Sequence, residues 1–256
     1  MQFLTAAISD VGIKKKVNQD AVLVKIASSG YGRIGLAAIC DGMGGLSNGE
    51  LASATMLRGI EEWFGNILPQ KFAASSRNEE IYESLLAMLR ETDKKLKDYI
   101  RQNGEQLGTT VSILLLTEEE YFIFYVGDTR IYLHDGMNLR LLSKDHTYVQ
   151  QEIDNGRMTE EEAENSSERS VLLQCVGASA KLEPDYISGR ISAKSVFLVC
   201  SDGFRHVLSK KELQKALSPK GFASEKKMED RLRTLVKTIK QRGEEDNISA
   251  VLMYAL

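Results

Sequence analysis

The sequence contains few of the residues that build disulfide frameworks, zinc sites or membrane spans. Its 256 residues include three cysteines, an odd number without CxxC spacing, which argues against a disulfide framework and a zinc site. Cys40 and Cys200 lie in apolar runs, so we expect buried, inert thiols. No run of about 18 apolar residues is present, and the start MQFLTAAISD lacks signal-peptide features. We therefore expect a cytoplasmic protein with no membrane partner.

A strong charge of either sign is also missing. The formal net charge is -3, and no basic stripe with interleaved aromatic residues is visible, which counts against nucleic acid as a partner. The 43% of hydrophobic residues suffices for a buried core. We expect one domain over residues 1–256, because no repeat or low-complexity linker divides the chain.

Clusters of short apolar runs are separated by longer segments in which apolar residues recur with helical spacing. The runs that predict strands are Arg33–Cys40, Val111–Leu116, Tyr121–Val126, Val196–Cys200 and Ile248–Tyr254. The stripes that predict helices run from Ala52 through Ile67, from Glu79 to Asn103 and from Met228 through Ile239. The turn Thr117–Glu120 predicts a hairpin. Because strands and helices do not alternate one for one, the pattern favours a mixed α+β layer architecture.

The stretch Asp145–Arg169 is polar and rich in acidic residues. We expect it to be a mobile surface insert near whatever the strands present, with a short helix that begins at Thr159.

Aspartates stand at the ends of several apolar strands. Asp41, Asp128 and Asp202 each close such a run, and Asp246 stands just before the last one. One such residue usually forms a turn or caps a helix. Four of them suggest carboxylates gathered at one end of a sheet, where divalent cations relieve the repulsion and the loss of solvation.

The residues around these aspartates favour hard cations. Gly42 lets its backbone approach an ion, and its carbonyl is a candidate ligand. His134, His146 and His206 are scattered, and we expect each to be a surface or hydrogen-bonded residue. Oxygen ligands without a His or Cys cluster favour Mg²⁺ or Mn²⁺ over zinc.

Seven segments, in order, resemble motifs of the metal-dependent type 2C serine/threonine phosphatases, especially the compact bacterial members. They are Val17–Ala21, Cys40–Ser53, Gly108–Thr110, Val126–Leu133, Leu142–Thr147, Val199–Phe204 and Glu245–Asn247, and they span nearly the whole chain.

The resemblance implies a fold and a site. The fold would be a four-layer αββα arrangement, a central sandwich of two antiparallel β-sheets flanked by helices on both faces. Two Mn²⁺ or Mg²⁺ ions would be held by Asp20, Asp41, the Gly42 carbonyl, Asp202 and Asp246, partly through waters, with Asn18 and Asn247 in support. Asp128 matches the ligand of a third, weaker ion, and residues 145–170 match a flap beside the active site.

The implied activity is hydrolysis of phosphoserine and phosphothreonine in proteins by a water activated between two cations, without a phosphoenzyme. The partners would be phosphorylated proteins, a serine/threonine kinase of the same cell and its substrates, with the phosphatase itself a monomer. The sequence offers no Cys-x5-Arg arrangement and no GxSxG nucleophile motif.

The chain departs from the family pattern at three places. Lys15 stands where the family usually has an arginine that grips the substrate phosphate, and lysine lacks the planar bidentate contact. The alternative is that Lys15 belongs only to a solvated basic run. Met43 replaces a histidine that some members use as a proton donor, and His146 is conceivable in that role by residue type alone. The flap reads Asn165–Gly177 without the His-Pro pair of many relatives, which concerns substrate contacts more than metals.

Two other functions stay open on the sequence. A pseudophosphatase would keep the fold as a regulatory binding module without turnover, and a two-metal nuclease would cut phosphodiesters. The complete set of motif aspartates argues against the first, and the near-neutral charge argues against the second.

Overall fold

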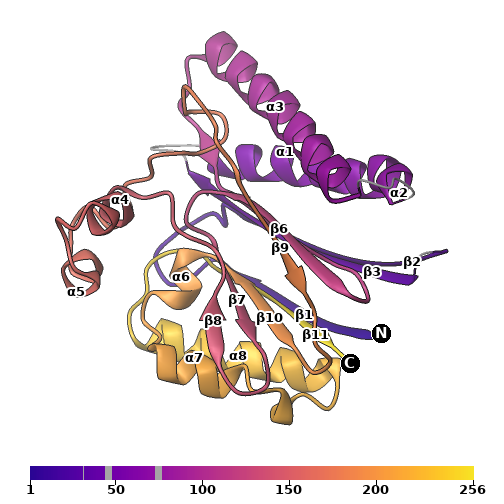
Figure 1. Ribbon diagram of the computed structural model, residues 1–256. Coiled ribbons are helices and arrows are strands. Elements are labelled where there is room, and N and C mark those ends of the chain that lie inside the picture. The colour runs from indigo at the N-terminus through magenta and orange to yellow at the C-terminus, as the bar shows by residue number, and fades with distance from the viewer. Residues whose placement is uncertain (31, 44–47, 73–76) are drawn as a thin grey trace.

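The computed structural model describes residues 1–30, 32–43, 48–72 and 77–256, and its chain folds into four layers (Figure 1). Two antiparallel sheets pack face to face, helices α1 and α3 cover one outer face, and helices α7 and α8 cover the other. The α+β sandwich expected from the sequence is therefore confirmed. Residues 44–47 of the Cys40–Ser53 motif lie outside the described residues.

Every strand of both sheets pairs antiparallel with its neighbours. The five-stranded sheet has the order β1-β11-β10-β7-β8, with β1 Phe3–Asp10, β7 Arg130–His134, β8 Leu139–Leu141, β10 Val196–Cys200 and β11 Ile248–Ala255. The other sheet has the order β2-β3-β5-β6-β9, with β4 paired to β3; its strands are β2 Asp20–Ser29, β3 Gly32–Met43, β4 Gly108–Thr109, β5 Val111–Leu116, β6 Glu120–Val126 and β9 Asp185–Arg190. The expected hairpin at Thr117–Glu120 joins β5 to β6.

The helices fill the outer layers and the connections. They are α1 Gly49–Glu62, α2 Leu68–Lys71, α3 Arg77–Asn103, α4 Tyr148–Asp154, α5 Glu160–Glu164, α6 Asp202–Arg205, α7 Lys210–Ala216 and α8 Glu225–Gln241, with a π-helical turn at Trp63–Ile67 and a 3-10 turn at Pro219–Gly221. In the parts of the chain that the structure describes, no helix is both long enough and apolar enough to cross a membrane.

Three hydrophobic cores separate the four layers. In β10, Phe197 and Val199 pack between the sheets, whereas Leu198 and Cys200 point to the core under α7 and α8. This alternation follows from the two-residue period of a strand. Because both faces of such central strands are covered, their sequences read as continuous apolar runs, and all eight residues of β11 are buried.

The apolar stripe that begins at Ala52 ends differently from the sequence expectation. Trp63 is fully buried as expected, but Ile67 is 39% exposed and Leu68 takes the buried position instead. The π-helical turn Trp63–Ile67 causes this shift. Its i to i+5 hydrogen bonding adds residues to the turn and rotates the following side chains relative to a 3.6-residue stripe.

The polar stretch after Asp145 forms a surface projection. Helices α4 and α5 extend from one end of the sandwich (Figure 1); most residues of α5 are exposed, whereas most of those of α4 are half-buried. Thr159 begins α5 with a capping box, in which its hydroxyl accepts from the Glu162 amide and the Glu162 carboxylate accepts from the Thr159 amide. The predicted helix start is confirmed.

Candidate active site

Asp20 and Asp41 lie directly opposite each other on adjacent strands. Asp20 is the first residue of β2, and the antiparallel register pairs it with Asp41 in β3. Thr110 fixes this part of β3, because its hydroxyl accepts from the Asp41 amide and its own amide donates to the Asp41 carbonyl, both at 2.9 Å. Like charges directly opposite across a ladder destabilise it, so this pair requires compensating positive charge.

The other sheet supplies Asp202 and Asp246 at neighbouring strand ends. Asp202 begins α6 immediately after β10, and Asp246 precedes β11, which pairs with β10. The two segments touch: a Cβ on Gly203 would lie 2.3 Å from the Asn247 carbonyl oxygen. Glycine at this position is therefore what allows the Asp202 turn to approach the Asp246 loop.

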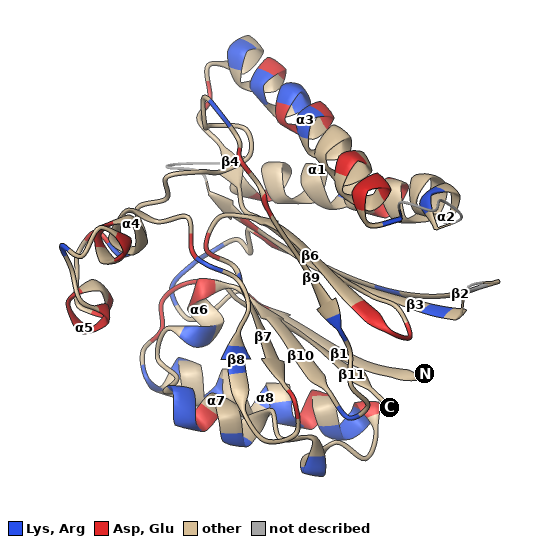
Figure 2. Ribbon diagram, in the orientation of Figure 1, with Lys and Arg blue, Asp and Glu red and all other residues tan. Residues whose placement is uncertain are grey.

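Asp128 lies where the chain crosses between the sheets. β6 belongs to one sheet and β7 to the other, and Asp128 is in the three-residue connection between them, 7% exposed. Gly127 makes the turn with a φ of +110°, a conformation that L side chains rarely adopt. The fold thus brings to one end of the sandwich all five aspartates that the sequence singled out. Figure 2 shows acidic residues on α6 and on loops at this end, from which α4 and α5 project.

Burial and mutual repulsion raise the pKa values of four of these carboxyls. Burial raises the pKa of Asp20 to about 7, the nearby Ser249 hydroxyl opposes this rise, and the Asp202 charge adds to it. Burial and the charge of Asp202 also raise the pKa of Asp128 to about 7. The pKa values of Asp41 and Asp202 are raised too, in both cases chiefly by burial. The cluster therefore resists carrying its full negative charge unless cations are present.

The donor set fits hard divalent cations. Both carboxylate oxygens of Asp20 and one of Asp202 are buried without a hydrogen-bond partner among the described residues. Buried, unpartnered carboxylate oxygens are costly without a compensating cation. In the described ranges, no group of three or more His, Cys, Asp or Glu side chains is arranged to hold an ion by itself.

Gly42 lies where only glycine fits. A Cβ there would be 2.2 Å from the Gly49 carbonyl oxygen and 2.6 Å from that of Gln19. The Gly42 amide donates to the Gln19 carbonyl at 3.1 Å. The backbone beside Asp41 is thus held tightly against α1 and the loop before β2, as a backbone ligand requires.

Asn247 joins the loop before β2 to the Asp246 segment. Its side-chain oxygen accepts from the Gln19 amide at 2.9 Å, and its side-chain nitrogen donates to the carbonyls of Val11 and Val17. Asn18 acts locally, since its side-chain oxygen accepts from the Asp20 amide at 3.1 Å. Both asparagines hold backbone next to an aspartate.

Lys15 lies at the edge of the cluster, so the structure places it beside the site. Its Nζ is 2.8 Å from an oxygen of Asp246, and the Lys15 side chain is 41% exposed. Burial lowers the pKa of Lys15, but the hydrogen bond to Asp246 and the charges of Asp246, Asp41 and Asp202 raise it further, so the net shift is upward. Lys15 therefore stays positively charged beside the aspartate cluster.

Arg130, Arg205 and Asp145 form a largely buried ion network that the sequence did not indicate. Arg130 donates from Nε and Nη2 to Asp145, and Arg205 also donates to Asp145, at 3.2 Å. These residues come from β7, the start of the flap and α6. Arg130 and Asp145 lie in two of the recognised motifs and Arg205 directly follows a third, but nothing in their order shows that they meet.

A second contact that the sequence did not reveal fixes the Asp246 loop. The Glu244 carboxylate lies 2.8 Å from His206 Nδ1, and it accepts from the amides of Glu245 and Asp246. Burial raises the pKa of Glu244, but its hydrogen bonds, that to His206 first, leave it lowered overall. An ionised Glu244 thereby ties the loop to the C-terminal end of α6.

His146 and His134 are engaged in structural contacts, as the sequence suggested for all three histidines. His146 Nδ1 accepts from the Gly127 amide, its ring stacks on Tyr125, and its Nε2 lies 3.4 Å from Asp185. His134 Nδ1 accepts from the Gly136 amide at 3.0 Å. His146 thus braces the turn beside Asp128, an arrangement that gives no support to a proton-donor role.

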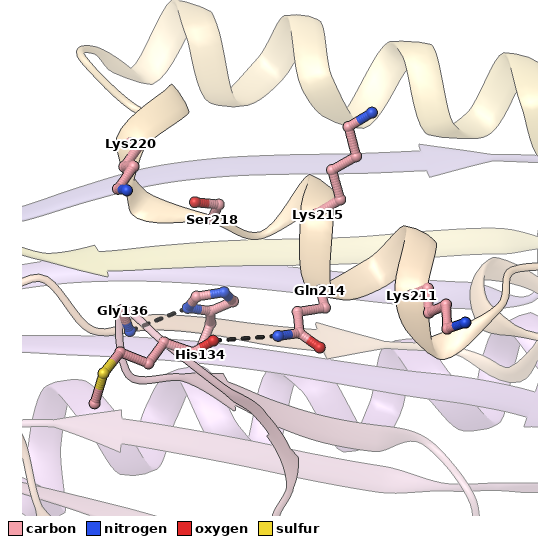
Figure 3. A pocket seen from close by; sticks show the side chains of 8 residues that line it. His134, Gly136, Lys211, Gln214, Lys215, Ser218 and Lys220 are labelled. Carbon is pink, nitrogen blue, oxygen red and sulfur yellow. Dashed lines mark hydrogen bonds between the residues drawn. The ribbon is translucent and has the colours of Figure 1, made fainter.

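Two buried cysteines and one surface cavity are separate from the aspartate cluster. Cys40 and Cys200 are fully buried, and burial raises the pKa of both thiols, that of Cys200 to about 12, so the inert thiols expected there are confirmed. A shallow cavity of about 550 Å³ lies between the β7–β8 turn and α7 (Figure 3). His134, Met137 and several lysines line it, and it contains none of the aspartates, so it does not belong to this site.

Comparisons with known proteins agree with this geometry. The sequence profile of the family described as protein phosphatase 2C matches residues 13–253. The serine/threonine phosphatase stp of Listeria monocytogenes is 28% identical over 219 residues, 84% of this chain and 82% of its own. The solved serine/threonine phosphatase PstP/Ppp of Mycobacterium tuberculosis has a TM-score of 0.83 and 26% identity, covering 99% of this chain and 98% of its own.

A further solved structure bears on the metals. The catalytic domain of the serine/threonine protein phosphatase PstP, in complex with two manganese ions, has a TM-score of 0.79 and 25% identity, covering 98% of this chain and 97% of its own. The match of the family profile to nearly the whole sequence, together with the shared fold, shows that this chain belongs to the protein phosphatase 2C family.

Proposed function

We propose that the aspartate cluster is where this chain, a serine/threonine protein phosphatase by its family and its relatives, removes phosphate from phosphoserine and phosphothreonine in proteins. The observation that carries the assignment of the site is the set of buried, unpartnered oxygens on Asp20 and Asp202. They lie at the end of the sandwich where the two sheets bring their aspartates together. A centre that binds hard cations requires such oxygen ligands.

The metal dependence of the family and the manganese-bound relative support two divalent cations here. Asp20, Asp41, the Gly42 carbonyl, Asp202 and Asp246 would hold them, as Mn²⁺ or Mg²⁺, and Asp128 is the candidate for a third. When bound, such ions lower the pKa of water and offset charge on phosphoryl oxygens. The protein's own contribution is to hold the carboxylates in place through Asn18 and Asn247.

Lys15 would bind the substrate phosphate as a compact positive charge. It is paired with Asp246 in the free protein, so an incoming phosphate would compete with that carboxylate. Because lysine offers no planar fork, it fixes the phosphate less firmly than arginine would. We expect lysine in place of arginine to weaken substrate binding more than it slows turnover.

The buried cysteines support a reaction without a protein nucleophile. Their raised pKa values keep the thiols protonated, and therefore poor nucleophiles. Attack by water, with no phosphoenzyme, is consistent with this environment.

In the cell, the chain would act as one catalytic domain over residues 1–256, with residues 145–170 as a flap beside the site. We place it in the cytoplasm as a monomer that works in signal transduction, opposing a serine/threonine kinase on the phosphorylated proteins which that kinase makes. The nearly balanced charge of the chain supports protein substrates over nucleic acid.

The deciding experiment offers purified protein with Mn²⁺ a phosphothreonine peptide, a small aryl phosphate and DNA. We expect phosphate release from the first two, abolished by chelation and by Asp202→Ala. A matched control is Asp230→Ala, which removes a surface aspartate on α8 that is ion-paired with Lys226. Cleavage of DNA alone would indicate a nuclease, and turnover of none of the three would indicate a pseudophosphatase.

A further inference from the structure

The cavity of about 550 Å³ between the β7–β8 turn and α7 has a basic lining. Lys211, Lys215 and Lys220 line it, and none of its eight lining residues is acidic. Lys220 lies on one side and Lys211 on the other, with His134 and Gln214 between them (Figure 3). The cavity is therefore locally positive on a chain whose net charge is -3.

These lysines are exposed, and no carboxylate in the described parts of the chain forms an ion pair with them. Lys211 and Lys215 are one helical turn apart in α7, a spacing at which like charges destabilise a helix. The acidic residues nearest in sequence are engaged elsewhere: Asp135 accepts from two amides of its own turn, and Glu212 is paired with Arg242. The arrangement thus lacks the negative partner that would offset its repulsion.

An ordered turn presents an apolar side chain beside the lysines. The Met137 side chain is 78% exposed, but its backbone is fixed, since its amide donates to Asp135 at 3.0 Å and its carbonyl accepts from the Gln214 side chain at 3.1 Å. The Gly136 amide donates to His134 Nδ1 within the same turn. The wall of the cavity is thus preformed, and a ligand would lose little free energy in ordering it.

The lining favours an acidic polypeptide over other anions. Carboxylates of such a segment would pair with the lysines, and an apolar side chain of the same segment would pack on Met137, because methionine adapts to irregular apolar surfaces. No aromatic side chain lines the cavity to stack on nucleic-acid bases. A free phosphate ion is small for this volume and gains nothing from the methionine.

Strand β7 connects the cavity to the active site. It begins at Arg130, two residues after Asp128, and ends at His134 in the cavity lining. At about 3.3 Å per residue, the chain from Asp128 to His134 spans at most about 20 Å. An extended peptide needs about six residues or more to cover that distance.

We propose that this cavity binds an acidic segment, with an apolar side chain, of the phosphoproteins on which the chain acts. The segment lies about six residues or more from the phosphorylated residue. The inference rests on the proposed function for the identity of the partner as a substrate. Binding there raises the local concentration of the phosphorylated residue at the aspartates, so it lowers KM without contact to the reacting atoms.

Binding is tested with a fluorescein-labelled, unphosphorylated peptide of glutamates and one leucine, by fluorescence anisotropy at low salt in EDTA. We expect saturable binding by the wild type. The combined variant Lys211→Gln, Lys215→Gln and Lys220→Gln should bind about tenfold more weakly or worse, because three exposed ion pairs of modest strength are lost.

A matched control removes three positive charges from the other outer layer. Arg58→Gln, Arg90→Gln and Lys94→Gln change exposed residues of α1 and α3, and together they should leave the affinity unchanged. No binding by the folded wild type, or an equal loss in the control variant, would overturn the proposal. Preferential binding of single-stranded DNA, of anionic phospholipid vesicles or of inorganic phosphate at the three lysines would overturn it too.

Met137→Gln separates a peptide site from a simple anion site. It should weaken binding of the leucine-containing peptide severalfold and leave binding of a peptide of glutamates alone unchanged. If Met137→Gln changed the affinity for neither peptide, recognition of a peptide at this cavity would be refuted.

The link to catalysis is tested with a phosphothreonine peptide that carries the acidic segment about ten residues away, a spacing that exceeds the extended minimum. In the comparison peptide, glutamines replace the glutamates. We expect a severalfold lower KM for the acidic peptide, and loss of this difference in the three-lysine variant. Hydrolysis of a small aryl phosphate by that variant should match the wild type.

The two failures are distinguishable. Equal KM values of the wild type for the two phosphopeptides would overturn docking of the substrate at the cavity. A protein that binds the acidic peptide but releases phosphate from no substrate would refute the proposed function and support the acidic-segment site, because the binding assay needs neither metal nor turnover.

Discussion

Removal of the divalent cations should make the stability of this protein fall as the pH rises from 5 to 7. The pKa of Asp20 is about 7 in the folded protein against an ordinary value of 3.8, chiefly because the carboxyl is buried. A carboxyl whose folded pKa is raised contributes stability that is fully present below the unfolded pKa. That stability is lost as the pH rises through the folded pKa, because the folded state must then hold a buried charge.

The expected size follows from the shift. Between pH 5 and pH 7 the unfolded carboxyl is ionised and the folded one is mostly protonated, so each pH unit removes about 1.4 kcal/mol, or about 2.7 kcal/mol in all from Asp20. For a chain of this length that corresponds to a fall in Tm of roughly 5–10 °C. Asp128, whose pKa is also raised to about 7, acts in the same direction. His134, whose pKa is lowered by burial, opposes it at the acidic end.

The assay is a series of thermal melts from pH 5 to 7.5, with EDTA and with excess Mn²⁺. We expect a falling Tm in EDTA and recovery of Tm by Mn²⁺ above pH 7, since an ion that binds only the folded state stabilises it. Asp20→Asn is the matched control because it keeps the shape without the charge. It should melt higher than the wild type at pH 7.5 in EDTA and gain less from Mn²⁺. A wild-type Tm that stays flat or rises between pH 5 and 7 in EDTA, with Asp20→Asn no more stable, would refute the reasoning.

Three substitutions test the supports of the site. Lys15→Arg should lower the KM for a small aryl phosphate severalfold with little change in kcat, by giving a bidentate phosphate contact; an unchanged or raised KM in steady-state assays would show that Lys15 does not bind the phosphate. Asn247→Ala leaves buried backbone groups unpaired and should lower the free energy of unfolding by about 1–3 kcal/mol in urea titrations; unchanged stability would mean that water replaces the side chain. Gly42→Ala forces a Cβ against a backbone oxygen at 2.2 Å, so activity at saturating Mn²⁺ should fall by an order of magnitude or more, and wild-type activity would contradict the close packing.

The sequence predicted most of the central strands and the long helices because their burial is nearly complete. Strands such as Val196–Cys200, covered on both faces, leave no ambiguity between apolar and polar positions. The prediction that Ile67 is buried was wrong. A π-helical turn changes the helical period there, and no residue type in that segment indicates such a turn. Local patterns therefore failed where the hydrogen-bonding register changed.

Within the site, some features of the aspartates could be predicted from the sequence and others depend on the tertiary structure. Their positions at strand ends, with glycine after Asp41 and Asp202, were visible in the sequence and indicated hard cations. The register that sets Asp20 opposite Asp41 was not visible, because it depends on pairing between strands. The same is true of the contacts of Arg130 and Arg205 with Asp145, which arise only when α6, β7 and the start of the flap meet.

The sequence by itself determined the α+β layers, the family and the chemical type of the site, because burial and residue type are local properties of the chain. The tertiary structure decided which charges face each other: Lys15 against Asp246, and both Arg130 and Arg205 against Asp145. Electrostatic interactions depend on distance and burial, and for residues far apart along the chain both are set only when the two sheets pack.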